Sequence, residues 1–381
     1  HTCITLNPTA QRTRNNQRHD AAQLRNLRRQ RGESLLLVTR AQADDDERRA
    51  HTEGTQAKRH SDISKWELFL SRAGKKGDTF LESIEIGDRF QQSDYFRGFL
   101  AYYRRNGFST KGHGTIGTGR LGTALGNIAS HFENEGLKNP IRSSSGKLNP
   151  ALNRQFKAYK INDPAVKRQP ALPLRFFKKF IKMEATETSE AIAQLFCCGL
   201  HFGMRSCEYS KTNERQTRTK ILRVRNIKFY NKLGRELTSN RKNAEFVKIT
   251  FENQKNGQKM ETQTRRRKDS ILCAVRLWAT VIERILSYNS TDENTTINTV
   301  RVDGRLRQLT CNQVRLHVKT AVTLLGEDYV QVKASEIGTH TLRVSFATMC
   351  DLEGVAPKKI MMAGRWLSTA FMKYVRDDSV L

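Results

Sequence analysis

The stretch GTHTLRVSFATMCDLEG, residues 338–354, carries the sequence pattern on which the fold prediction depends. Its apolar residues recur at helical spacing, with Thr339 near the start and Gly354 at the exit, which predicts an α-helix. Residues three apart share one helix face, so His340 and Arg343 are expected to project together. Taken alone, the pair is more typical of a solvated helix face than of a functional site.

A second cationic position follows a long apolar helix. GMRSCEYS, residues 203–210, comes directly after EAIAQLFCCGLHF, and this order predicts that Arg205 lies at a largely buried helix end. Glu208, three residues on, is placed to pair with Arg205 and to hold its guanidinium. Taken alone, a structural ion pair is the simpler interpretation.

Two lysines flank a predicted hairpin turn. NQKNGQK, residues 253–259, contains the Asn-Gly signal of a β-hairpin, after a strand predicted at 245–252 and before METQTRRR. Lys255 precedes the turn and Lys259 follows it. A lysine at a hairpin tip is ordinarily a solubilising charge, but it is also a mobile cation that can reach a leaving oxygen.

A tryptophan and a tyrosine lie near the C-terminus. AGRWLSTAFMKYVR, residues 363–376, contains Trp366 and Tyr374, and the spacing of Phe371 and Tyr374 predicts a packed amphipathic helix. Core packing is the simpler role for Tyr374 by itself. A chemical role requires groups elsewhere in the chain that make its phenol reactive.

In this order, GMRSCE, a hairpin lysine, HTLR, GRW and a following tyrosine resemble the tyrosine recombinases, or phage-type integrases. The version GRWLSTAFMKY is similar to the recombinases of Crypton-type eukaryotic mobile elements. The resemblance is specific over roughly 188–376, where Trp366 follows Arg343 by 23 residues and Tyr374 follows Trp366 by eight. Many members have His in place of Trp366, whose indole can donate one hydrogen bond but cannot titrate. The spacing from Trp366 to Tyr374 is also one residue shorter than in many bacterial members.

The resemblance implies a mainly α fold with a small β-sheet, in which a helical core-binding domain precedes a mixed α/β catalytic domain. It implies that two guanidiniums clamp the non-bridging oxygens of a DNA phosphodiester, for which the planar fork of arginine is suited. The implied roles are a clamp for Arg205 and Arg343, support for Glu208, proton transfer for His340, a hydrogen bond or packing for Trp366, general acid for Lys255 in preference to Lys259, and nucleophile for Tyr374.

The implied reaction passes through a 3′-phosphotyrosyl intermediate and keeps the phosphoester energy in the protein link, so neither ATP nor a metal ion is expected. The sequence has no Walker-type loop, and the Gly-rich GTIGTGRLGTALG at 114–126 lacks a preceding strand. No cofactor is therefore expected. The implied partners are double-stranded DNA and a homo-tetramer on two DNA sites, in the nucleus if the source is eukaryotic.

The composition favours a polyanionic partner. The 381 residues include 67 Lys and Arg against 38 Asp and Glu, giving a formal net charge of +29, which is typical of nucleic-acid-binding proteins. None of the seven cysteines forms a CxxC pair, so neither a zinc site nor a disulfide framework is indicated. No apolar run reaches the length of a membrane span.

Composition also divides the chain. The polar, basic residues 1–60 predict a mostly disordered arm, and 61–163 a helical DNA-binding domain of the core-binding type. Its first helix, SDISKWELFLSRAG, is expected to be capped by Ser61 or Asp62. Prolines at 164–174 predict an extended linker, and 175–381 is the predicted catalytic domain.

Three other functions remain open at this point. A type IB topoisomerase uses a similar residue set, although HTLR and GRW fit integrases better. A catalytically silent DNA-binding protein derived from a mobile element would keep the same charge. A basic RNA-binding module is the least favoured, because no RNP-like aromatic motif appears.

Overall fold

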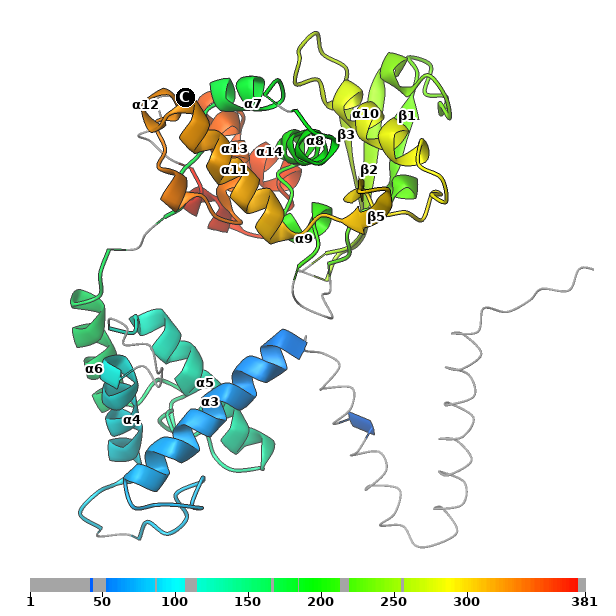
Figure 1. Ribbon diagram of the computed structural model, residues 1–381. Coiled ribbons are helices and arrows are strands. Elements are labelled where there is room, and N and C mark those ends of the chain that lie inside the picture. The colour runs from blue at the N-terminus through cyan, green and yellow to red at the C-terminus, as the bar shows by residue number, and fades with distance from the viewer. Residues whose placement is uncertain are drawn as a thin grey trace, which may run out of the picture. The chain divides into compact units, whose positions relative to one another are not determined.

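The computed structural model describes residues 42–43, 53–85, 88–106, 115–165, 168–183, 185–212, 219–254 and 257–375 (Figure 1). The chain divides into two compact units, His1–Pro164 and Ala165–Leu381. Most of the predicted arm at 1–60 lies outside the described residues, and so does Lys255.

The first unit is a set of helices around an aromatic core. Trp66 stacks on Phe96 with ring centroids 4.7 Å apart, and Phe99 meets Trp66 edge-on at 5.5 Å. All three side chains are fully buried, as the helical spacing of the apolar residues predicts. The helices described in this unit are α3 (Glu53–Arg72), α4 (Gln92–Asn106), α5 (Thr118–Asn134) and α6 (Pro150–Ile161).

The start of the first helix differs from the prediction. α3 begins at Glu53, so residues 53–60 are helical and neither Ser61 nor Asp62 is a cap. Asp62 is instead fully buried, and its carboxylate accepts hydrogen bonds from Arg120 at 2.9 Å and from Asn127 at 2.8 Å. Both partners come from α5, more than fifty residues away, so the local pattern suggested a cap where the fold has a long-range ion pair.

Asp163, near the end of the first unit, connects the residues after α6 to α4 and to the start of α5. Its carboxylate accepts hydrogen bonds from Arg104 Nη1 at 2.7 Å and from the Thr118 backbone N–H at 2.8 Å. Hydrogen bonds from Thr118, and then from Arg104, lower the pKa of Asp163 from 3.8 to about 2. The ionised carboxylate is therefore favoured by folding.

Asp163→Asn is expected to lower the melting temperature of the full chain at pH 7, and the difference from wild type should shrink on acidification. Because the pKa is depressed in the folded state, the stabilisation is complete above 3.8 and is lost as the pH falls through about 2. Thermal melts at neutral pH and near the lower value measure this, with the exposed Glu135→Gln as control. A difference that stays constant with pH would contradict the assignment.

The second unit is built around α8 (Glu187–His201), which contacts α10, α11, α13 and β4. Figure 1 shows α8 between the helices α11, α13 and α14 and the sheet that carries α10. All ten residues from Ala191 to Leu200 are buried, as expected for the central apolar helix. The other described helices are α7 (Leu174–Phe180), α9 (Ser206–Tyr209), α10 (Ala274–Leu286), α11 (Cys311–Leu325), α12 (Glu327–Val330), α13 (Thr341–Leu352) and α14 (Pro357–Ala363), with 3₁₀ segments η1 (Val224–Asn226), η2 (Arg241–Asn243), η3 (Ala334–Glu336) and η4 (Thr369–Lys373).

The larger sheet has the antiparallel order β1-β2-β3, formed by β1 (Ile227–Tyr230), β2 (Phe246–Asn253) and β3 (Lys259–Arg266). The predicted hairpin is confirmed, because Asn253 pairs with Lys259 across β2 and β3. The strand predicted at 222–230 is shorter than expected, since its first half includes the 3₁₀ turn η1.

A second hairpin was not predicted. It joins β4 (Thr299–Val302) to β5 (Arg305–Gln308), with Val302 paired to Arg305. Asp303 and Gly304 form the turn with φ of 50° and 74°, the left-handed pair that an Asp-Gly loop adopts in tight hairpins. The Asp-Gly turn signal was therefore present in the sequence, but the strands on either side of it are too short and too polar to be recognised as strands.

The predicted linker at 164–174 includes Leu174, which is instead the first residue of α7, and described residues before it contact the second unit. Leu172 is fully buried in the core of the second unit, and its N–H donates to Ser345 Oγ at 2.8 Å. Gln169 Oε1 accepts a hydrogen bond from the His340 backbone N–H at 2.8 Å. The second half of this segment is therefore part of the second unit.

The predicted fold class, mainly α with a small β-sheet, is confirmed over the described residues, where helices are the commonest element of both units and the strands form two small sheets. Within those residues, no helix combines the length and the apolar character needed to cross a membrane.

Candidate active site

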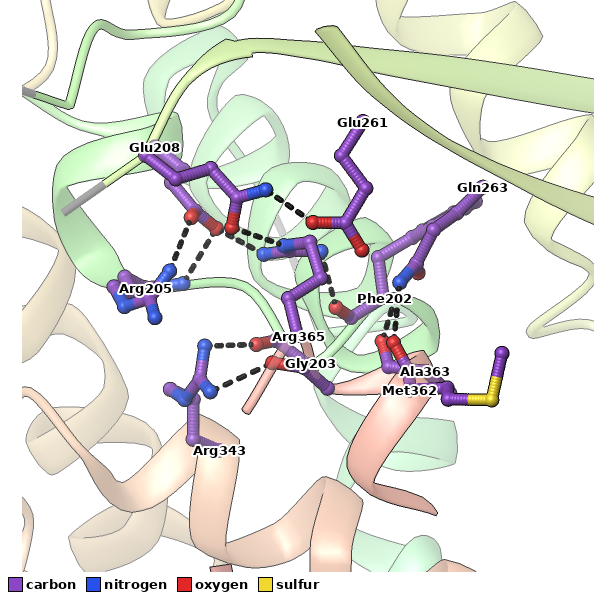
Figure 2. Close-up of polar contacts among 12 residues, drawn as sticks. Phe202, Gly203, Arg205, Glu208, Glu261, Gln263, Arg343, Met362, Ala363 and Arg365 are labelled. Atoms are coloured by element: carbon purple, nitrogen blue, oxygen red, sulfur yellow. Dashed lines mark hydrogen bonds and ion pairs between the residues drawn. The ribbon is translucent and has the colours of Figure 1, made fainter. Parts of the chain in front are cut away.

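Arg205 lies in the short connection between α8 and α9 and is held by Glu208. Glu208 Oε1 accepts from Arg205 Nη1 at 3.0 Å, and Oε2 accepts from the Arg205 backbone N–H at 2.9 Å (Figure 2). The carboxylate is 1% exposed, whereas the Arg205 side chain is 18% exposed. The expected ion pair is thus present, and it leaves the guanidinium partly accessible.

Arg343 comes from the first turns of α13 and points toward the same region. Its Nη1 donates to the Gly203 carbonyl at 2.9 Å and its Nη2 to the Gly364 carbonyl at 2.7 Å (Figure 2). Arg343 therefore bridges the loop before Arg205 and the turn before Trp366. Gly203 has a φ of +51°, and a Cβ there would lie 2.6 Å from the Phe346 ring. Only glycine therefore fits this backbone conformation so close to Phe346.

Trp366 covers the Arg343 guanidinium, whose central carbon lies 4.3 Å from the centroid of the indole ring. The ring folds back over Gly364, where a Cβ would meet it at 1.6 Å, so any other residue at that position would displace the indole. Packing on a guanidinium face is the arrangement of a cation–π contact. The structure therefore places Trp366 at the site as a packing residue.

Tyr374 lies in the turn after η4 and not in the amphipathic α-helix that its spacing predicts. Its ring centroid is 5.8 Å from that of Trp366 and 6.2 Å from that of His340. The planes of the Tyr374 phenol and the His340 imidazole differ by 25°. His340 is exposed at the N-cap of α13, and Tyr374 is half-buried. Five predicted positions are thus brought into one region of the second unit: Arg205, His340, Arg343, Trp366 and Tyr374.

The two hairpin lysines are not among these five positions. Lys255 lies outside the described residues. Lys259 is the exposed first residue of β3. The preference for Lys255 over Lys259 therefore stays a prediction.

Arg365 is a buried residue of the site that the sequence analysis passed over. Its Nη2 donates to Glu208 Oε2 at 2.5 Å, its Nη1 to the Phe202 carbonyl at 3.0 Å and its Nε to Gln254 Oε1 at 3.2 Å (Figure 2). Arg365 is part of the GRW motif, but the family resemblance implies a role there for Trp366 and not for the arginine. No local signal distinguishes an inward Arg365 from an outward one.

Two glutamines were also missed. Gln254 is 2% exposed and connects Arg365 to Glu261, to whose Oε2 its amide donates. Gln263 Nε2 donates to the carbonyls of Met362 at 3.1 Å and Ala363 at 2.8 Å, which fixes the end of α14 (Figure 2). Both lie on the β2–β3 hairpin, so the sheet supports the turn that carries Arg365 and Trp366.

Positive charge exceeds negative charge in this region. The guanidiniums of Arg205, Arg343 and Arg365 are here called the arginine cluster. Arg205 and Arg365 both donate to the carboxylate of Glu208, whereas Arg343 donates to two backbone carbonyls. The carboxylate of Glu261 accepts from the Gln254 amide. Burial, and next the charge of Arg205, lowers the pKa of Arg343 to about 9, while Glu208 opposes this shift. Arg343 therefore stays protonated at neutral pH, although burial and the nearby charge of Arg205 disfavour its positive charge. A bound anion would offset this unfavourable energy.

Sulfate or inorganic phosphate is expected to raise the melting temperature of the full chain more than chloride does at equal ionic strength. At tenfold excess over its Kd, an anion that binds only the folded chain contributes about 1.4 kcal/mol. Arg205→Gln should remove most of this excess, because Arg205 is the accessible member of the arginine cluster. Arg276→Gln, which removes an exposed charge paired with Asp269, should leave it intact. Equal anion effects in both variants would show that the stabilisation comes from elsewhere on the surface.

The described residues contain no group of three or more His, Cys, Asp or Glu side chains arranged to hold a metal ion. Besides the carboxylates of Glu208 and Glu261, the polar groups that converge here are guanidiniums, an imidazole, a phenol and amides. Such donors are suited to an oxyanion such as a phosphodiester.

No protein-family model matches the sequence, and no curated protein matches it. Similar solved structures include the Tn1549 transposon integrase in complex with circular intermediate DNA, at 12% identity and a TM-score of 0.44, covering 84% of this chain and 96% of that one. They also include the XerH site-specific recombinase bound to palindromic difH substrate, at 17% identity and a TM-score of 0.46, covering 84% of this chain and 74% of that one. A third is a lambda integrase dimer bound to a core site, at 13% identity and a TM-score of 0.44, covering 84% of this chain and 96% of that one. Similarity of this degree does not by itself assign this chain to a family.

Proposed function

We propose that this chain is a tyrosine recombinase that cuts and rejoins double-stranded DNA through a 3′-phosphotyrosyl intermediate. The observation that carries the proposal is the meeting of Arg205 and Arg343, from separate elements, beside the Trp366, His340 and Tyr374 side chains. A structural ion pair needs neither a surplus of guanidiniums nor a half-buried phenol stacked on an imidazole. A site that cleaves a phosphodiester with a tyrosine nucleophile uses both.

The arginine cluster would stabilise the reacting phosphate. A guanidinium has five N–H groups, and the two carbonyls engage one hydrogen on each Nη of Arg343. Further N–H groups of Arg343 therefore remain to donate to phosphate oxygens. Two arginines contacting the two non-bridging oxygens would neutralise the charge that grows in the pentacoordinate transition state. Arg343 is only 2% exposed, so this contact requires a local movement of the Trp366 or Tyr374 side chain.

The bond changes follow from the residue types. The Tyr374 phenol oxygen would bond to phosphorus and lose its proton to His340, while the bond from phosphorus to the deoxyribose 5′ oxygen breaks. Lys255, or Lys259, would give a proton to that leaving oxygen. The reverse attack by a 5′-hydroxyl of a partner strand restores the diester and the phenol. The phosphoester energy stays in the protein link, so these steps use neither a metal ion nor ATP.

The remaining parts of the proposal follow from charge and from the requirements of strand exchange. A net charge of +29 would supply sequence-independent affinity for DNA phosphates, with the first helical unit acting as the core-binding domain. Exchange of four strands would require a homo-tetramer on two DNA sites. The GRWLSTAFMKY motif favours a Crypton-type eukaryotic mobile element as the source, and therefore action in the nucleus.

The experiment that tests the proposal uses nicked suicide DNA duplexes that cover candidate element ends. Covalent protein–DNA adducts are resolved on denaturing gels, and joint DNA molecules are measured in parallel. An adduct together with joint molecules supports a recombinase. An adduct on arbitrary supercoiled DNA with relaxation supports a type IB topoisomerase instead. Tight DNA binding without any adduct supports a silent DNA-binding protein.

A further inference from the structure

We infer that Arg365 is a positioning residue that sets the orientation of both Arg205 and the β2–β3 hairpin. The inference rests on the proposed function, because the groups it positions are those assigned to DNA cleavage. Arg365 is 2% exposed, and its three hydrogen bonds reach the loop after α8, the end of β2 and the carboxylate of Glu208. Figure 2 shows this guanidinium between Glu208 and Phe202.

The first action of Arg365 is on Arg205, through Glu208. One oxygen of that carboxylate binds Arg205 Nη1, and the other is shared by the Arg205 backbone N–H and Arg365 Nη2. Arg365 thereby fixes the rotation of the carboxylate about its last bond. The direction of the Arg205 guanidinium then follows from the direction of the oxygen that it binds.

The second action is on the base of the hairpin, through Gln254. Arg365 Nε donates to Gln254 Oε1, and the Gln254 backbone N–H donates to the Gln258 carbonyl at 3.0 Å across the hairpin. Gln254 directly precedes Lys255 in the sequence. The same guanidinium therefore contacts both the loop after α8 and the residue that follows β2.

The conformation of Arg365 supports a built-in role. Its φ is +56°, in the left-handed region that non-glycine residues rarely occupy and that is retained when surrounding contacts hold it. The guanidinium carbon lies 3.6 Å from the centroid of the Phe251 ring. Three acceptors in three directions match the planar fork of arginine, and a single lysine ammonium cannot reach them all.

The test compares Arg365→Lys with Arg265→Lys. Arg265 is a matched control, because it is a half-buried arginine whose Nε donates to the His201 carbonyl at 2.9 Å and which lies over the Phe202 ring at 4.8 Å. Single-turnover adduct formation should fall on the order of 100-fold in Arg365→Lys, the loss expected from a misplaced reacting group. DNA affinity should be retained, and Arg265→Lys should stay within a few-fold of wild type.

A double-mutant cycle with Glu208→Gln distinguishes positioning from a general structural role. If Arg365 acts through Glu208, the double variant should be no slower than the slower single variant. Multiplicative losses, or cleavage by Arg365→Lys within a few-fold of wild type, would overturn the inference.

Side-chain NMR supplies a readout that does not depend on activity. The Nε–H signal of Arg205, assigned by its disappearance in Arg205→Lys, should be ordered in the full-length wild type and mobile in Arg365→Lys. An unchanged signal would overturn the inference whether or not adducts form. If the wild type forms no adduct and the Arg205 signal still loses its order in Arg365→Lys, the proposed function fails and the positioning role stands.

Discussion

Replacing Tyr374 by phenylalanine is expected to abolish the covalent protein–DNA adduct. The substitution removes only the oxygen that would attack phosphorus and keeps the ring that lies beside His340 and Trp366. No other group in the site can form the same phosphoester, so the adduct should fall below detection and not merely slow down. The measurement is adduct formation on a nicked suicide duplex, together with a thermal melt and a DNA-binding titration.

The control for this substitution is Tyr329→Phe, which alters an exposed tyrosine of α12 in the same unit. It should leave the adduct unchanged. The Tyr374→Phe chain should melt and bind DNA as the wild type does. An adduct that persists in Tyr374→Phe would return Tyr374 to the packing role that its spacing alone suggests, and would move the search to another nucleophile.

The second large effect is expected for Arg343→Lys. Losing a preorganised donor to a developing oxyanion costs about 10²–10³-fold in rate, and lysine cannot reproduce the two-pronged contact of a guanidinium. Lysine retains the charge and can still donate to one of the two carbonyls that Arg343 bridges, whereas alanine would leave both unsatisfied at about 1–3 kcal/mol each. Lysine is therefore the sharper variant.

DNA binding separates a clamp from a general cationic contact. With 67 basic residues in the chain, removing one guanidinium from a buried site should spare most of the salt-sensitive affinity. Arg205→Ala, at the accessible member of the arginine cluster, should behave in the same way. If either variant lost binding to the same extent as cleavage, the clamp role would have to be abandoned.

Much of the fold was predictable because the signals are local. The apolar run before Arg205 predicts the buried α8, and the Asn-Gly turn predicts the β2–β3 hairpin. The pairing of Arg205 with Glu208 was also predictable, since the two residues are three positions apart. Each of these statements needs only the spacing of neighbouring residues.

What the sequence did not reveal depends on partners far along the chain. Asp62 has the residue type and position of a helix cap, yet Arg120 and Asn127 hold it inside the first unit. Arg365 is adjacent to Trp366, and only the fold shows that Glu208, 157 residues away, directs it inward. Neither arrangement has a signature within ten residues of the side chain concerned.

The hydrogen bond from the His340 backbone to Gln169 has a practical consequence for protein engineering. Chain from Gln169 onward is anchored to the second unit, and Leu172 is buried in its core. A spacer inserted before Gln169, or a foreign DNA-reading module grafted there, would leave that anchor and the imidazole beside it undisturbed. If the first unit reads DNA as proposed, a chimaera with a new target preference would be joined between Pro164 and Gln169.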